Sequence, residues 1–199
     1  MSTATTSRVY TADDLLAMPD DGVRRWIING ELREQQMETG ELNGQIMTIR
    51  NRFHSEMMAN ITTAVNVWRY SLPEPRGRVV CGEAGVLLPG GPENAVGVDM
   101  AYVPPDVMVQ QTEDTTVIHG VPTLIVEIIS PNTTARAINE RVRTYHRAGV
   151  PLVRVIDPDP RIVMIRRRGA RTVVVNDEQE LTGDPELPGF RVPVARLFE

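Results

Sequence analysis

The chain has 199 residues and a formal net charge of -5. A domain of this size buries roughly 70 % of the surface of its unfolded chain, so it needs no disulfide, and the single cysteine, Cys81, allows none. The negative charge argues against a protein whose main task is to coat nucleic acid. There is no basic-then-apolar leader and no apolar run of bilayer length, so we expect a cytoplasmic protein with no membrane partner.

The basic residues have one unusual property. All 21 lysine-or-arginine positions are arginine. Codon bias explains this simply, but no mechanism that requires a lysine can be supplied by this chain.

The first part of the chain predicts a loose start, a short helix, a hairpin and a long helix. Residues 1–9 are rich in serine and threonine and are expected to be disordered. Thr11 is a plausible N-cap for the short helix. Asn29-Gly30 is typical of a two-residue hairpin turn. Apolar residues at helical spacing predict a long helix over residues 52–70.

The rest of the chain predicts strands around one helix. Short apolar runs separated by turn residues predict strands over 78–82, 85–88, 96–103 and 124–129. A helix is predicted over 133–148, with further strands over 150–156, 161–167 and 172–175. The strand, helix, strand order from 124 to 156 predicts a parallel crossover. No repeat or linker divides the chain, so residues 10–199 are expected to form a single α/β domain.

Glu127 is the most informative single position. It lies in the run 124–129, which is otherwise apolar on both faces, as is typical of a central strand. An ionised carboxylate buried there without a partner would be costly, so something must compensate for it. Glu127 also lies near the carboxyl end of its strand, where open α/β sheets usually form ligand crevices.

Asp99 is a second acidic residue in a predicted strand. If the two strands are neighbours, Asp99 and Glu127 converge and offer the oxygen ligands that Mg²⁺ prefers. The alternative is structural: Glu127 pairs with a buried arginine such as Arg141 or Arg154, and Asp99 lies in a turn. The pattern alone leaves both interpretations open.

A series of motifs follows the chain in order from about residue 10. They are Tyr10–Leu16, Asn29–Leu32, His54, Gly82–Gly85, Val98–Val103, Pro122–Pro131, Tyr145 with Ala148–Val150, Asp157-Pro158 and Leu187–Phe190. Together they resemble the Uma-type restriction endonuclease family of the PD-(D/E)xK nuclease superfamily. The resemblance implies a restriction-endonuclease-like mixed central β-sheet flanked by helices, and metal-dependent phosphodiester hydrolysis. We expect an N-terminal helix and hairpin and a C-terminal β-hairpin around that sheet.

The resemblance also assigns site residues. It implies that Asp99 and Glu127 are the two acidic positions, although Val98 replaces the expected proline. The expected lysine is absent at Ile129; in the family it lies on the next helix, where this chain has Arg141. Arginine keeps its proton, so Arg141 could stabilise charge but could not act as a base. Either a metal activates the water, or activity is lost.

Other residues are candidates near the same site. His54 could be an acid/base or outer-shell group, with a partly exposed helix histidine as the alternative. Glu83 is a candidate third metal ligand, with a solvated strand-end carboxylate as the alternative. Trp26 stands where the family is expected to carry a glutamate, which removes an auxiliary group. Asp106 competes with Asp99 for the first acidic role, although the two prolines before it favour a loop.

Two functions therefore compete. The first is a Mg²⁺- or Mn²⁺-dependent endonuclease acting on DNA, with Asp99, Glu127 and Glu83 as ligands and with Arg141 and His54 as further catalytic groups. The second is a nuclease-derived binding or assembly module that no longer cleaves. Five arginines between residues 161 and 171 could contact DNA phosphates or could shield a sheet edge. A homodimer is expected by analogy, because a duplex has two strands.

Overall fold

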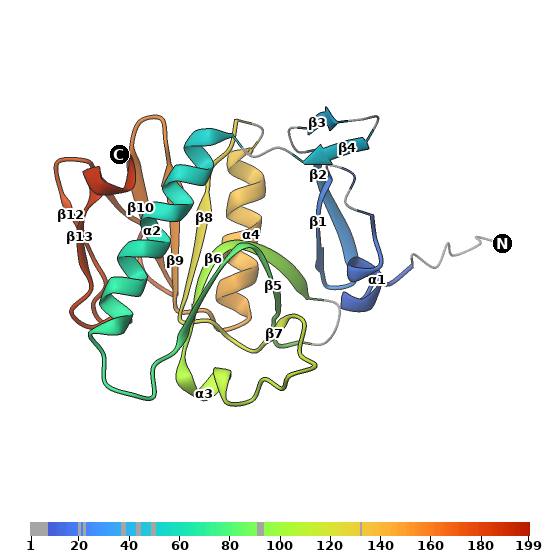
Figure 1. Ribbon diagram of the computed structural model, residues 1–199, viewed down its shortest axis with the longest axis horizontal. Helices are drawn as coiled ribbons and strands as arrows, with labels where there is room; N and C mark the ends of the chain where they lie inside the picture. Colours follow the sequence, from blue (N-terminus) through green and yellow to red (C-terminus); the bar gives the residue numbers. More distant parts are fainter. Residues whose placement is uncertain are drawn as a thin grey trace.

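A mixed seven-stranded β-sheet with helices on both faces forms the centre of the structure, a computed structural model (Figure 1). It describes residues 8–19, 21, 23–36, 39–42, 45–48, 51–90, 94–131 and 133–199. The predicted fold class, a mixed sheet flanked by helices, is confirmed. The predicted disordered segment 1–9 lies outside the described residues except for its last two positions.

The strand order of the central sheet is β11-β10-β9-β8-β6-β5-β7. The strands are β5 (Arg78–Leu87), β6 (Ala95–Val103), β7 (Ile118–His119), β8 (Leu124–Ile128), β9 (Leu152–Asp157), β10 (Ile162–Arg167) and β11 (Val173–Asn176). The pairs β8/β9 and β5/β7 are parallel, and the other neighbours are antiparallel. Helix α4 (Ala135–Arg147) connects β8 to β9, so the predicted parallel crossover is confirmed.

Two apolar cores lie on opposite faces of this sheet, one under helix α2 (Arg52–Tyr70) and one under α4. Side chains alternate between the faces of a strand. Accordingly, Leu124 and Val126 of β8 belong to the α2 core, whereas Ile125 belongs to the α4 core. Each helix therefore needs only one apolar stripe, which is what the helical spacing predicted.

Smaller elements surround the sheet. They are α1 (Ala12–Leu16), β1 (Val23–Ile28), β2 (Glu31–Gln36), β3 (Thr39–Leu42), β4 (Gln45–Thr48), α3 (Pro105–Met108), β12 (Glu180–Thr182), β13 (Arg191–Pro193) and the 3-10 helix η1 (Val194–Leu197). The pairs β1/β2, β3/β4 and β12/β13 are separate antiparallel sheets. None of the described helices is both long and apolar enough to cross a membrane.

The β1/β2 hairpin packs against the central sheet without joining it. Asn29 and Gly30 at its turn have φ angles of 50° and 76°, the left-handed backbone that this two-residue turn requires. Trp26 and Ile28 of β1 bury their side chains in the α4 core, and β1 packs against β6. Figure 1 shows the hairpin beside the central sheet, outside its hydrogen-bonded ladder.

Two local predictions were wrong. The predicted strands 78–82 and 85–88 are one strand, β5, with a bulge between Cys81 and Ala84. Gly82, which separated the two predicted strands, instead lies within the bulge. Its φ is 85°, and that of the following residue, Glu83, is 60°. The loop expected at Asp106 is the short helix α3, because proline is tolerated in the first turn of a helix.

Trp68 tests the α2 core. Its ring meets Tyr102 and Phe190 edge-on, with centroids 5.1 and 6.2 Å away, and its Nε1 donates to the Pro188 carbonyl. We expect Trp68→Ala to lower the free energy of unfolding in urea by about 3–5 kcal/mol. Val67→Ala is the matched control, because Val67 is 67 % exposed and its truncation should change stability by no more than about 0.5 kcal/mol. Equal losses in the two variants would contradict this role of Trp68 in the core.

Candidate active site

The ladder between β6 and β8 ends where the acidic residues begin. It pairs Tyr102 with Leu124 and continues to Met100 with Val126, and one further step in this register sets Asp99 opposite Glu127. There the Asp99 carboxylate replaces a ladder partner, because its Oδ2 accepts a hydrogen bond of 2.7 Å from the Ile128 backbone N–H. Both acidic residues are fully buried, with 0 % exposure. The two predicted acidic positions therefore meet on adjacent strands.

Two side chains of α4 hold Glu127. The Tyr145 hydroxyl donates to Oε1 at 2.5 Å, and Arg141 Nη1 lies 2.8 Å from Oε2. Arg141 is one of the two buried arginines that the structural alternative named. The other, Arg154, lies away from Glu127. It donates to the Thr182 carbonyl and stacks on the Phe190 ring. The structure thus combines the pairing of that alternative with the convergence of Asp99 and Glu127.

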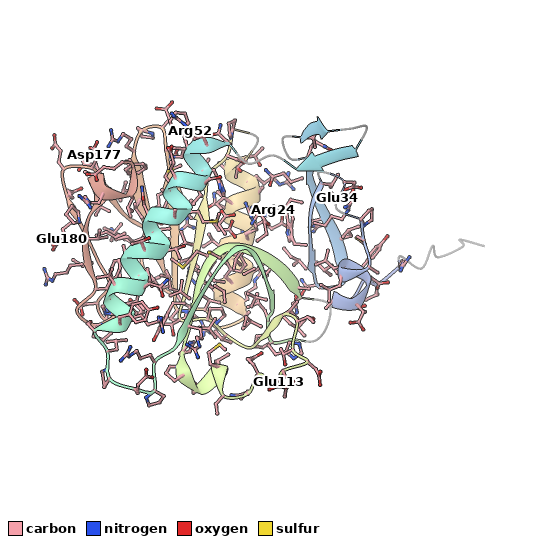
Figure 2. All side chains as sticks on the ribbon, viewed as in Figure 1. Arg24, Glu34, Arg52, Glu113, Asp177 and Glu180 are labelled. Atoms are coloured by element: carbon pink, nitrogen blue, oxygen red, sulfur yellow. The ribbon has the colours of Figure 1, made fainter. Side chains whose placement is uncertain are left out.

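Arg24 joins the acidic residues to one another. Its Nε lies 2.8 Å from Glu83 Oε2, and its Nη2 lies 3.5 Å from Asp99 Oδ1 and 3.6 Å from Glu127 Oε2. Nη2 also donates to the Gly97 carbonyl at 2.9 Å. The side chain extends from β1 into the region between the hairpin and the sheet (Figure 2).

Arg24 was not among the residues predicted from the sequence. A signal was present in the sequence. Arg24, Trp26 and Ile28 are spaced two residues apart in β1, and residues at this spacing share one face of a strand. An arginine in line with two large apolar residues indicates a buried cation that needs acidic partners. By contrast, Arg25 points to the other side and pairs with Asp21 and Glu34.

Glu83 reaches the site through the β5 bulge. The left-handed backbone of Gly82 and Glu83 directs the Glu83 carboxylate over Gly97, where an added Cβ would lie 3.2 Å from Oε2. The side chain of Glu83 is 30 % exposed and contacts Arg24. Glu83 therefore lies at the rim of the site, on the outer side of the guanidinium.

His54 approaches Asp99 from the opposite face of the sheet. It lies in the first turn of α2, with Nε2 3.4 Å from Asp99 Oδ2. The partly exposed histidine that was the alternative is wrong, because His54 is only 4 % exposed. His54 also lines a cavity of about 390 Å³ together with Phe53, Met57 and Phe198. This histidine is the side chain that connects the acidic pair to that cavity.

The remaining candidates lie apart from these contacts. Asp106 is exposed on α3, and none of the described contacts of Asp99 or Glu127 involves it. Trp26 is buried, and Cζ of the Arg141 guanidinium lies over its indole ring, 5.5 Å from the ring centroid. Three of the late arginines contact local partners, namely Arg161 with Asp177, Arg166 with Asn139 and Arg167 with Glu186. At this end of the sheet the edge strand is β11 and not the arginine-bearing β10.

The electrostatics keep Asp99 ionised and Arg24 charged. Burial alone would raise the pKa of Asp99, but His54, Arg24 and the Ile128 N–H outweigh it and hold the pKa well below its usual range. Burial alone would lower the pKa of Arg24, but Glu127 and Asp99 outweigh it and raise that pKa. Burial and the Glu127 charge raise the pKa of Tyr145 well above its usual value, so its hydroxyl is a donor and not a base.

The donor set suits a cation between the two acids. Asp99 Oδ1 and Glu127 Oε2 are buried acceptors that make no hydrogen bond in the described part of the chain, yet both face Arg24 Nη2, and Glu127 Oε2 also pairs with Arg141. As arranged, the described residues include no group of three or more His, Cys, Asp or Glu side chains that could hold a metal ion. The residues thus fit a divalent ion between Asp99 and Glu127 only when the Arg24 guanidinium has moved away from these two oxygens.

The low pKa of Asp99 makes stability depend on pH. The folded state favours the ionised carboxylate, so its contribution is complete above the ordinary aspartate pKa near 4 and is lost as the pH falls toward the lower folded-state pKa. We expect Asp99→Asn to cost on the order of 1–3 kcal/mol at pH 7 in urea unfolding, and this deficit to shrink below about pH 4. Asp106→Asn should cost little at either pH, because Asp106 is exposed. A deficit of Asp99→Asn that is unchanged at pH 3 would refute this pH dependence.

Comparison with known proteins gives the family and supports the fold. No curated protein matches the chain. The crystal structure of a putative nuclease belonging to DUF820 from Anabaena variabilis is similar, with a TM-score of 0.72 and 16 % sequence identity over 95 % of this chain and 97 % of that one. The Uma2 family model, described as "Putative restriction endonuclease", matches residues 12–195. The resemblance of the sequence motifs is therefore confirmed, and the chain belongs to the Uma2 family of putative restriction endonucleases.

Proposed function

We propose that this protein is a divalent-metal-dependent nuclease that hydrolyses DNA phosphodiester bonds at Asp99 and Glu127. The observation that carries the proposal is the pair of buried carboxylates on adjacent strands, each with an oxygen that faces one cation position. Both the family description and the nuclease-like fold support a nuclease-type function. Asp99 and Glu127 would hold Mg²⁺ or Mn²⁺, the ions for which carboxylate and water oxygens are suitable ligands.

The rest of the site orients these ligands. The Ile128 N–H fixes one oxygen of Asp99, and Tyr145 and Arg141 fix Glu127, so neither carboxylate is free to rotate. A bound divalent ion would polarise the scissile phosphate and lower the pKa of an attacking water. Arg141 cannot take the proton of that water, because arginine remains protonated.

His54 is the side chain best placed to move a proton. Its Nε2 faces Asp99, and it lines the 390 Å³ cavity. An imidazole can both donate and accept a proton, and a general acid–base role requires reach to the reacting group. We place the approach of the DNA strand at this cavity, since it connects the surface to a residue that contacts the acidic pair.

The first test removes one carboxylate charge at a time. We expect Asp99→Asn and Glu127→Gln each to lower Mn²⁺-dependent DNA cleavage at least about 100-fold, a loss typical of removing a group that stabilises transition-state charge. Cleavage should be measured on supercoiled, linear and single-stranded DNA, with and without EDTA. Asp106→Asn is the control and should retain wild-type cleavage, because that carboxylate is exposed on α3. Wild-type cleavage by both site variants would refute the assignment.

A second candidate function is a binding or assembly module that does not cleave. It is favoured by the two guanidinium groups, Arg24 and Arg141, which balance the charges of Asp99 and Glu127 without a metal. Such a module would bind DNA equally in EDTA and in Mn²⁺ and would leave every DNA form intact. Restored cleavage in Arg141→Lys would then indicate that a lysine at this helix position is what the site lacks.

A further inference from the structure

We infer that Arg24 is the resident cation of the acidic site and that a divalent ion binds there only by displacing its guanidinium. The inference rests on the proposed function, since it concerns how the same pair of carboxylates would take up a metal. What carries it is the position of Nη2, which lies 3.5 Å from Asp99 Oδ1 and 3.6 Å from Glu127 Oε2. These are the two buried carboxylate oxygens of the pair that make no hydrogen bond in the described part of the chain. Glu127 Oε2 also lies 2.8 Å from Arg141 Nη1, but Arg141 approaches Glu127 alone, whereas Arg24 lies close to both acids.

The guanidinium and a metal ion compete for the same atoms. A ligated Mg²⁺ would need direct contact with carboxylate oxygens at about 2.1 Å, inside the region that Nη2 now faces. A dication held between the two acids would also repel the positive charge of Arg24 across a short distance in a buried setting. Arg24 is itself deeply buried, with a side-chain exposure of 7 %, so solvent screens this repulsion poorly.

The structure leaves space into which the Arg24 guanidinium can move. Its Nε is anchored 2.8 Å from Glu83, on the outer side of the site, and Arg24 and Glu83 both line a cavity of about 660 Å³. The guanidinium can therefore retreat toward Glu83 while it keeps that ion pair. The β1/β2 hairpin that carries Arg24 makes no ladder with the central sheet among the described strands, so this movement breaks no ladder hydrogen bond. It gives up the hydrogen bond from Nη2 to the Gly97 carbonyl.

This arrangement assigns a role to Glu83. Its carboxylate is not between Asp99 and Glu127 but behind Arg24, where the β5 bulge directs it. Glu83 thus holds the arginine that would leave, and its part in metal binding is to receive the displaced charge. The protein can then keep its acidic pair compensated both with and without a metal ion.

The experiment is a Mn²⁺ titration of the full-length protein by isothermal calorimetry, with no DNA present. We expect Arg24→Gln to bind Mn²⁺ at least about tenfold more tightly than the wild type, because the competing charge is gone while the side chain keeps its polar end. Arg25→Gln is the matched control. It removes the neighbouring arginine, which pairs with Asp21 and Glu34 outside the site, and should leave the affinity unchanged.

The outcomes separate the inference from the proposed function. Wild-type binding that Asp99→Asn abolishes, combined with unchanged affinity in Arg24→Gln, would overturn the inference and leave the nuclease proposal standing. No Mn²⁺ binding by either the wild type or Arg24→Gln would overturn both. If Arg24→Gln does not fold, the Arg24 Nε–H resonance of the wild-type protein can be followed by NMR during a Mg²⁺ titration. A shift of that resonance at saturation is expected, and an unchanged resonance would overturn the inference.

Discussion

Asp99 and Glu127 are two negative charges buried side by side, and the surrounding structure compensates for them. Both residues are fully buried. Two neighbouring carboxylates disfavour each other's ionisation unless cations and hydrogen-bond donors surround them. Arg24, Arg141, Tyr145 and the Ile128 N–H supply that environment. Removing any one of these groups leaves a buried charge short of a partner, which is far more costly than losing a surface ion pair.

This requirement explains why the site draws on so many separate elements. The acids come from β6 and β8, the compensating groups come from α4 and the β1/β2 hairpin, and His54 comes from α2 on the other face of the sheet. The two cores hold these elements against the sheet and so fix the distances between the charged groups. Packing and chemistry are therefore coupled, and a hairpin that looks peripheral in Figure 1 carries a central charge.

Residues whose environment is set locally could be predicted from the sequence. Glu127 stands out as one carboxylate in an apolar strand, and the parallel crossover follows from the order of elements around it. Arg24 was missed because its partners are far along the chain, and no local pattern states against which strand a hairpin will pack. The β5 bulge was missed for a related reason, since Gly82 indicates a turn as readily as a bulge until the partner strand is known. The burial of His54 likewise depends on residues far along the chain, such as Ile129 and Phe198, which line the same cavity.

The absence of lysine limits how such a site can change state. A buried lysine can lose its proton when its surroundings disfavour charge, so it can release a carboxylate by becoming neutral. Arginine does not have this option, and the carboxylates around Arg24 raise its pKa further against the effect of burial. The guanidinium of Arg24 therefore keeps its positive charge wherever Asp99 is ionised. Asp99 Oδ1 and Glu127 Oε2 become available to another cation only when this guanidinium moves, so metal uptake at the site would be a displacement of one positive charge by another.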